Sequence, residues 1–336
     1  MRKFLAVLVG LPFACLYAQT NSGTIIGSVR DAQDAVVTTA SVTVTNVATS
    51  VAKTLPVNSA GEFAVPYLVP GEYTVSAESA GFKRTTRENI TLRVSDQLVI
   101  NLRLEVGAIA ETVTVRATTP NLETASVTLG QVVDTRQILD LPLNGRDAMS
   151  LASLAPGVIP QDVAPGSAVQ LGNTVPGVNG ANFSTSGVTV DGGSNSTPRG
   201  TTYMMIYSPN VDSIAEFRVQ TNAMSAEFGR TNGGSISMVT KSGTNQVHGT
   251  AYWFERNRAV DANDFFSNRQ GIPLGALHRH QAGATIGGPV YIPKVYNGRD
   301  KTFFFFDYEA FREAVGNPNT FTVPTALERS GDYLIT

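Results

Sequence analysis

Residues 213–249, SIAEFRVQTNAMSAEFGRTNGGSISMVTKSGTNQVHG, hold the stretch that decides the fold. Two strand-like runs, residues 214–221 and 235–240, stand on either side of a glycine-rich link. In the first run Glu216, Arg218 and Gln220 alternate with apolar residues, so one face of the predicted strand is more polar than the other. The glycines of the link permit positive φ and close backbone approach. This pattern predicts two strands joined by a glycine-rich link.

The sequence motifs of this stretch resemble those of a known protein family. The turn SAEFGRTNGG and the segment VTKSGTNQVHG are similar to the end of the plug domain in TonB-dependent outer-membrane receptors, and most of all in their Oar-like branch. In that family the plug leads directly into a transmembrane barrel. The resemblance implies a mainly β chain with an N-terminal β-sandwich, an α+β plug domain and the first strands of a transmembrane β-barrel. An ordinary β-hairpin in a soluble sandwich is the alternative interpretation.

Composition narrows the class of protein. The chain has 336 residues, a formal net charge of −2 and 15% charged residues, whereas about a quarter of the residues are charged in an ordinary soluble domain. This length predicts two or three domains. The small net charge gives no reason to expect a nucleic-acid partner.

The N-terminus has the pattern of a secretory signal. Arg2 and Lys3 precede an apolar run, and Ala18 offers a small residue at a cleavage position. We therefore expect residues 1–18 to be removed on export. Cys15 is the single cysteine of the chain, so the mature protein would carry no disulfide and no cysteine-based metal site.

Residues 23–106 have the pattern of one small all-β domain. The motifs NSAGEF, LVPGEYTV and AGF resemble the carboxypeptidase-regulatory-like, starch-binding-like sandwich, which carries no zinc ligands in carboxypeptidases. Short β-rich runs separated by turn residues support this interpretation. The expected strands are residues 24–30, 41–46, 62–65, 72–77, 90–94 and 98–104.

Residues 107–120 form a linker with one β-prone stretch. In the family, an acidic residue followed by Thr-Val-x-Val before the plug is the TonB box, and the matching residues here are Glu111, Thr112, Val113, Thr114 and Val115. A short strand of this kind can add to the sheet edge of a periplasmic partner through backbone hydrogen bonds. The alternative is that the stretch is the last edge strand of the sandwich.

Residues 121–246 are the expected plug. LPLNGRD breaks the chain, residues 147–154 have helical spacing, and Pro156 with Gly157 ends that helix. Two irregular loops, residues 161–182 and 194–207, follow. Because outward plug loops meet the ligand in this family, the candidate contact residues are Asn179, Asn182, Arg199, Tyr203 and Met204. Disorder of these loops is the competing interpretation.

Residues 247–336 have the pattern of an outer-membrane barrel, with the long first extracellular loop expected at residues 257–278. KTFFFFDYEAFR is similar to early barrel strands of the Oar-like group. Such barrels have about 22 strands, so we expect the sequence to be an N-terminal piece of a longer receptor. The predicted strands are residues 248–256, 279–288 and 302–311.

The alternation in the third of these runs sets its orientation. Phe304, Phe306 and Tyr308 share one face, and Asp307 and Glu309 share the other. A charge on the lipid side costs up to a few kcal/mol near the midplane, so we expect the carboxylates to face the lumen.

Catalytic and metal motifs do not emerge from the sequence. None of the three histidines begins an H-E-x-x-H pattern, and no G-x-S-x-G or P-loop motif occurs. Asp191-Gly192-Gly193 hints at a calcium loop, but Thr202 stands where the EF-hand glutamate is expected. We therefore expect no enzyme activity, no metal and no cofactor.

The resemblance implies a TonB-dependent receptor that binds an extracellular ligand and moves it to the periplasm with energy transmitted by TonB. Its implied partners are the periplasmic C-terminal domain of TonB, outer-membrane lipid, and a ligand that is a glycan, a peptide or a siderophore. Its implied place is the bacterial outer membrane, with the N-terminal domain in the periplasm. A non-transporting adhesion or carbohydrate-binding protein is the alternative.

Overall fold

The computed structural model describes residues 23–108, 112–116, 129–141, 143–159, 175–181, 185–199, 202–222, 231, 233–316 and 323–331. The chain is mainly β, as the sequence indicates. It divides into two compact units, Met1–Gly249 with Thr285–Phe306, and Thr250–Ala284 with Asp307–Thr336. In the part that the structure describes, the helices are too short or too polar to span a bilayer.

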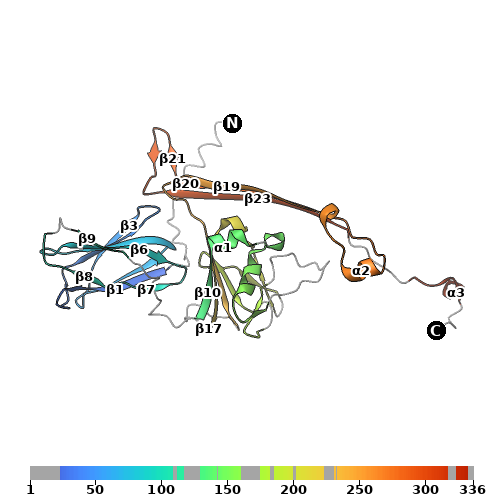
Figure 1. Ribbon diagram of the computed structural model, residues 1–336, viewed down its shortest axis with the longest axis horizontal. Helices are drawn as coiled ribbons and strands as arrows, with labels where there is room; N and C mark the ends of the chain where they lie inside the picture. The colour runs from blue at the N-terminus through green and yellow to red at the C-terminus, as the bar shows by residue number, and fades with distance from the viewer. Residues whose placement is uncertain are drawn as a thin grey trace, which may run out of the picture. The chain divides into compact units, whose positions relative to one another are not determined.

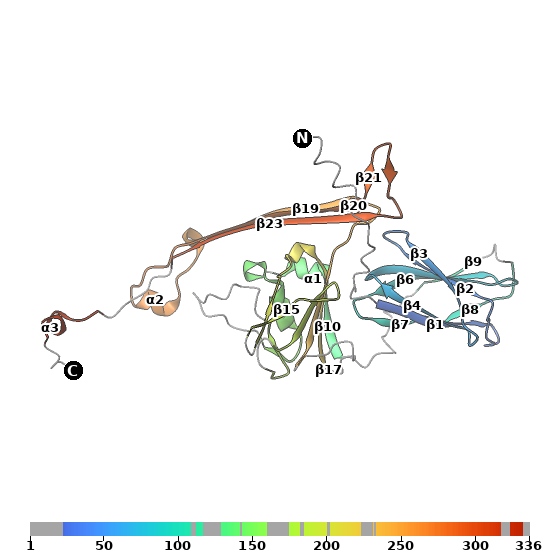
Figure 2. The same cartoon turned by 180° about the vertical axis from the view of Figure 1, so that it is seen from behind.

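The N-terminal part is a sandwich of two sheets, which Figure 2 shows as separate layers. One sheet has the order β4-β1-β7, with β8 also paired to β1, and the other has the order β3-β2-β5-β6-β9. The strands are β1 (Gly23–Asp31), β2 (Ser41–Asn46), β3 (Ala52–Pro56), β4 (Glu62–Leu68), β5 (Gly71–Glu78), β6 (Arg84–Leu92), β7 (Gln97–Val99), β8 (Leu102–Leu104) and β9 (Thr112–Arg116).

Alternation explains the sandwich core. Along β2, Val42 and Val44 are buried while their neighbours are partly exposed, which is what a sheet with one wet face requires. Nineteen buried residues from both sheets form one apolar cluster. A core of this kind supplies the stability of the sandwich without any disulfide.

Two expected strands of the sandwich differ in the structure. The run predicted at residues 90–94 is the end of β6, which begins earlier, at Arg84, and stops at Leu92. The chain turns there because Asp96 Oδ2 accepts a hydrogen bond from Arg93 N at 3.0 Å and Ser95 has a φ of 58°. The run predicted at residues 98–104 is split into β7 and β8.

The middle part holds a five-stranded sheet of order β10-β17-β18-β13-β14. The two predicted strands of the opening stretch are β17 and β18, which pair antiparallel, while β13 pairs parallel to β18. Two small ribbons, β11 with β12 and β15 with β16, accompany the sheet. The strands are β10 (Leu129–Asp134), β11 (Val158–Ile159), β12 (Gly177–Val178), β13 (Gly187–Val190), β14 (Gly193–Ser194), β15 (Ser196–Arg199), β16 (Thr202–Met205), β17 (Ile214–Asn222) and β18 (Ser235–Thr240).

Short helices cover this sheet. The helix expected at residues 147–154 is the 3-10 helix η2 (Ala148–Leu154), which buries Met149 and Leu151 and is capped by Asp147 through a 3.0 Å hydrogen bond from Met149 N. Burial raises the pKa of the Asp147 carboxyl. The other helices here are α1 (Thr135–Asp140), η1 (Asn144–Arg146) and η3 (Val211–Ser213).

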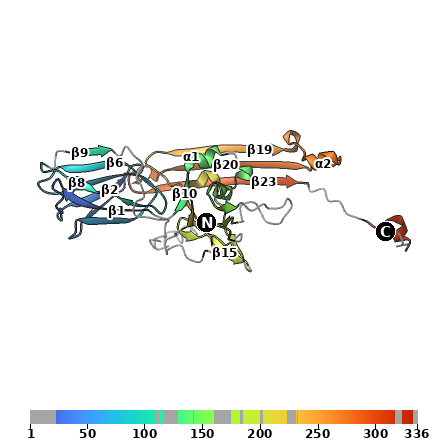
Figure 3. The same cartoon turned by 60° about the horizontal axis from the view of Figure 1, so that its bottom comes forward.

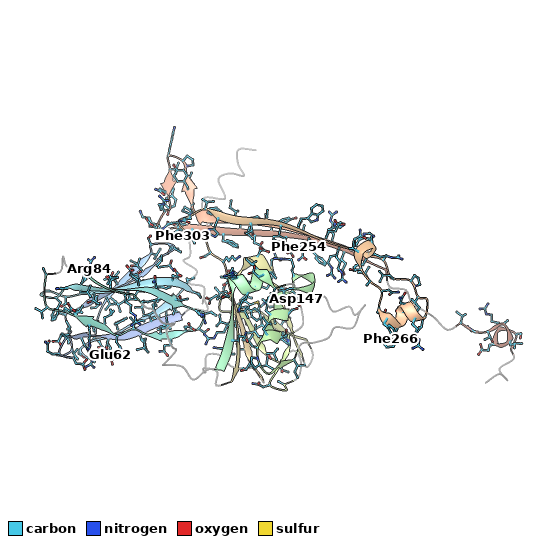
Figure 4. All side chains as sticks on the ribbon, in the orientation of Figure 1. Glu62, Arg84, Asp147, Phe254, Phe266 and Phe303 are labelled. Atoms are coloured by element: carbon cyan, nitrogen blue, oxygen red, sulfur yellow. The ribbon has the colours of Figure 1, made fainter. Side chains whose placement is uncertain are left out.

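The C-terminal part is a three-stranded sheet of order β19-β20-β23, in which the long strands run side by side (Figure 1). Side chains project from both faces of this sheet, and Phe254 lies along it (Figure 4). The elements are β19 (His248–Asn257), η4 (Arg258–Val260), α2 (Phe265–Arg269), β20 (Leu277–Pro289), β21 (Tyr291–Ile292), β22 (Tyr296–Asn297), β23 (Phe303–Val315) and α3 (Ala326–Arg329).

The alternation of two faces expected for the last run is present in β23, and the orientation of the carboxylates toward the lumen stays a prediction. Phe304, Phe306 and Tyr308 of β23 are exposed, while Asp307 and Glu309 on the opposite face are partly buried. An apolar outer face and a charged inner face are what a membrane strand requires.

Candidate functional site

The expected TonB-box stretch is strand β9. Its residues Thr112–Arg116 pair in parallel with Arg84–Glu88 of β6, as Figure 3 shows for the two strands. Within the described residues β9 ends the sheet, and Thr114 is exposed. The alternative from the sequence, a last edge strand of the sandwich, thus describes its pairing. Binding of TonB by the same strand stays a prediction, and Glu111 lies outside the described residues.

The candidate ligand residues that the structure describes lie on the turn after β12 and on the hairpin of β15 and β16. Asn179 is exposed, follows β12 with a φ of 53°, and donates from Nδ2 to Thr221 O. Arg199 ends β15, and Tyr203 and Met204 lie in β16. Asn182 lies outside the described residues. The structure therefore places three of the five candidates on one hairpin.

The expectation of an irregular loop at residues 194–207 was wrong. Ser196–Arg199 and Thr202–Met205 form an antiparallel hairpin in which Thr197 faces Met204 and Pro198 faces Tyr203. Proline and a serine- and threonine-rich composition made this segment look irregular, since proline is unusual inside strands. The hairpin gives Arg199 and Tyr203 a defined backbone place on the plug.

The two glycines just before β18 allow close approach of neighbouring backbone. A Cβ at Gly233 would lie 2.5 Å from Val178 O, and a Cβ at Gly234 would lie 2.8 Å from Gln220 O. Only glycine lets β12 and β17 come this close to the start of β18. Gly229, the other expected glycine of the link, lies outside the described residues.

The LPLNGRD motif fixes a buried ion pair inside the plug. Arg146, which has a φ of 53°, pairs with Asp212, and both side chains are mostly buried. Gly145 before it has a φ of 69°. The left-handed turn therefore aims the guanidinium at η3, at the start of β17.

A pair of hydrogen bonds joins Asp191, which follows β13, to the end of β18. Asp191 accepts hydrogen bonds from Thr240 N at 2.9 Å and from Thr240 Oγ1 at 2.7 Å. The aspartate that suggested a calcium loop in the sequence is therefore used to hold β18 in place. Among the described residues no group of three His, Cys, Asp or Glu side chains could hold a metal ion.

Sequence reasoning missed a charged junction between the sandwich and the plug, which both belong to the first compact unit. Arg218 Nη1 of β17 donates to Asp96 Oδ1 at 2.6 Å, and the two side chains are 4% and 6% exposed. Arg218 and Glu216 share the polar face noted in the sequence. That alternation was the available signal, but nothing in it says what covers the face.

The strands of the second compact unit carry polar contacts on one face. Tyr252 Oη donates to Glu309 Oε2 at 2.7 Å, and Arg279 pairs with Glu313 at 2.5 Å. On β23, Glu309 and Glu313 stand opposite the exposed aromatic residues Phe306 and Tyr308. These contacts fit a face turned away from lipid.

Comparisons with known proteins agree with this arrangement. The model of the carboxypeptidase regulatory-like domain matches residues 24–105, and that of the outer membrane beta barrel domain matches residues 239–335. The chain is 29% identical over 304 residues to the TonB-dependent transporter Oar of Myxococcus xanthus, covering 86% of this chain and 26% of that protein. The chain thus spans about a quarter of the length of the curated relative it matches.

Solved structures add little. A protein described as carbohydrate binding from Bacteroides uniformis shares 8% identity at a TM-score of 0.22, over 87% of this chain and 99% of that one. The Bacillus anthracis TIE protein shares 10% identity at a TM-score of 0.23, over 85% of this chain and 48% of that one. Neither score bears on the fold. The sandwich, the plug sheet and the membrane-type strands, together with these matches, make the chain similar over most of its length to the TonB-dependent transporter Oar, with a carboxypeptidase regulatory-like domain near one end and an outer membrane beta barrel domain at the other.

Proposed function

We propose that this chain belongs to a receptor that captures a ligand outside the cell and moves it to the periplasm with energy transmitted by TonB. In this proposal residues 1–18 are the export signal, 23–106 a periplasmic sandwich, 107–120 the linker with the TonB box, 121–246 the plug and 247–336 the start of the barrel. Ligand capture and transport by the whole receptor are part of the proposal.

The observation that carries the proposal is strand β9. It stands at the end of its sheet within the described residues, with Thr114 exposed, and it precedes the plug in the chain. A partner strand can add to such an edge by backbone hydrogen bonds. About four of these bonds, at a net ~0.5–1.5 kcal/mol each, provide a few kcal/mol. That strength suits a contact that must form and break in every cycle.

The ligand side of the proposal rests on the plug. The β15–β16 hairpin holds Arg199, Tyr203 and Met204, and Asn179 stands on the turn after β12. We propose these residues as ligand contacts. Glycans, peptides and siderophores all offer the hydrogen-bonding groups that such side chains can recognise.

The experiment uses the full-length receptor in outer-membrane preparations and the purified C-terminal domain of TonB. Val113→Pro removes an N–H donor from β9 and fixes φ. Losing one or two backbone hydrogen bonds predicts a loss of affinity of about 2- to 150-fold. Thr114→Ala changes an exposed side chain and keeps the backbone, so it should bind like the wild type.

The two outcomes separate the interpretations. Weakened binding by Val113→Pro, with normal receptor abundance in the membrane, supports the TonB box. Wild-type affinity for both variants would mean that β9 is an edge strand of the sandwich and nothing more.

A further inference from the structure

The polar face of β17 is buried instead of wet. Arg218 and Gln220 are 4% and 2% exposed, although their alternation with apolar residues predicts a solvated face. The other face holds Phe217 and Val219, which belong to the plug core. Strand β17 is therefore covered on both sides.

The turn between β6 and β7 of the sandwich contacts this face. Arg218 Nη1 donates to Asp96 Oδ1 and to Val94 O, both at 2.6 Å. Val94 N in turn donates to Glu216 Oε2 at 2.7 Å. The Val94 side chain is fully buried, yet it belongs to neither the sandwich core nor the plug core. These contacts form one junction of charge, backbone and an apolar side chain.

The sandwich side of the junction is fixed within its own domain. Asp96 accepts from Arg93 N at 3.0 Å through its side chain, and its carbonyl accepts from Thr24 N of β1 at 2.8 Å. The turn is thus tied to the first sheet, while β6 in the second sheet leads directly into it. A movement of the turn away from β17 would move the sandwich with it.

The two buried charges of the junction, on Arg218 and Asp96, favour either a fully docked or a fully released sandwich. When the sandwich is docked, each charge is compensated by the other, whereas a half-open state would leave one of them buried without compensation. When the sandwich is released, both charges are hydrated. Docked and released states are therefore favoured over intermediate ones. Asn245 also bonds Ala48 O at 3.0 Å and Ser50 Oγ at 3.4 Å, but such exposed contacts contribute little on their own.

We propose that the Arg218–Asp96 junction is a latch that couples the packing of β17 in the plug to the docking of the sandwich. When β17 is displaced from the plug core, the junction loses its geometry, and the sandwich is released together with β6 and β9. The sandwich then reports the state of the plug to the periplasm. The latch is independent of the identity of the ligand and of whether β9 binds TonB.

The test follows hydrogen exchange in the full-length receptor, in detergent, over peptides that cover residues 91–100 and 214–222. Asp96→Ala opens the latch directly and should speed exchange at residues 93–97 about a hundredfold. Arg103→Met is the matched control, because it removes an exposed ion pair with Asp34 in the same sandwich. That control should leave residues 93–97 unchanged.

The coupling between the packing of β17 and the docking of the sandwich is tested by a substitution on the opposite face of β17. Phe217→Leu loosens β17 within the plug core, to which none of residues 93–97 belongs. The proposal nevertheless predicts about tenfold faster hydrogen exchange at residues 93–97. In the Asp96→Ala background the same substitution should add nothing there. Leu151→Val, in the same plug core but off β17, controls for general loss of stability.

Two results would overturn the latch. One is wild-type protection of residues 93–97 in Asp96→Ala. The other is faster exchange of β17 in Phe217→Leu without any change at residues 93–97. Should Asp96→Ala fail to assemble, Asp96→Asn keeps the size and an acceptor oxygen, and it should still speed exchange at the turn several-fold.

Discussion

Glu216 offers the sharpest test of the junction, because its protonation state differs between the docked and released sandwich. Burial, with a smaller contribution from the nearby Asp96, raises the pKa of its carboxyl from the ordinary 4.5 to about 7. The hydrogen bond from Val94 N, together with Arg93 and Arg218, opposes this shift. On the neighbouring strand β10, Asp134 stands in register with Glu216.

The direction in which pH changes the docking of the sandwich follows from the linkage between proton binding and docking. A raised pKa means that the docked state binds the proton more tightly than the released state. This contribution to docking is complete below pH 4.5 and is lost as the pH rises through 7. Docking should therefore weaken as the solution becomes alkaline.

Glu216→Gln keeps an acceptor for Val94 N but cannot ionise. Linkage with pKa values of 4.5 and about 7 predicts that the variant protects the junction about 10-fold better than wild type at pH 5.5 and about 300-fold better at pH 8.5. The change between the two pH values is about 30-fold, or about 2 kcal/mol. Hydrogen exchange at residues 93–97, measured on both proteins at each pH, gives this ratio without correction for intrinsic rates.

The control is Glu72→Gln, which makes the same chemical change at an exposed position of β5. The reasoning would be refuted if the ratio of hydrogen-exchange protection between Glu216→Gln and wild type stayed constant from pH 5.5 to 8.5. A constant ratio would mean that docking does not desolvate this carboxyl.

Three further predictions concern the separate parts. Gly234→Ala should destabilise the plug by about 1–3 kcal/mol, since its Cβ would lie 2.8 Å from Gln220 O; an unchanged midpoint in chemical denaturation contradicts this. Tyr73→Phe should cost the isolated sandwich about 1 kcal/mol, because the hydroxyl donates to Val69 O at 2.6 Å; thermal melting measures it, and an equal Tm speaks against a net contribution. Phe306→Lys should reduce heat-modifiable receptor in the outer membrane, since a midplane Lys costs about 2–4 kcal/mol; Phe306→Leu is the control, and equal assembly of both would place this face away from lipid.

The sequence predicted those elements whose pattern depends on one buried face. Alternation located β2 through Val42 and Val44, and it set the register of β23 through Phe304 and Asp307. In each case burial of one face alone determines the period of two. The signal is local, so no knowledge of distant contacts was needed.

Elements that depend on distant partners could not be predicted in the same way. Strand β3 (Ala52–Pro56) has no buried residue and is held by its pairing to β2. Ser196–Met205 pairs as a hairpin despite Pro198. The burial of Arg218 depends on a turn 122 residues earlier in the chain. A polar face that binds another domain has the same local pattern as a polar face in water.

The central claim, that β9 is the strand by which TonB engages this receptor, is tested most directly by disulfide trapping in cells. Residues 1–336 hold one cysteine, Cys15, within the expected signal, and any cysteine elsewhere in the full-length receptor is replaced by serine, so that a single introduced cysteine reports its own contacts. Thr114→Cys places the thiol at an exposed position of β9, and Thr54→Cys places it at an exposed position of β3, at the other edge of the same sheet. Each full-length receptor is expressed with TonB variants that carry one cysteine in the periplasmic domain. The account predicts a receptor–TonB disulfide from residue 114 and none above background from residue 54, whereas equal trapping at both edges, or none at residue 114, would contradict it.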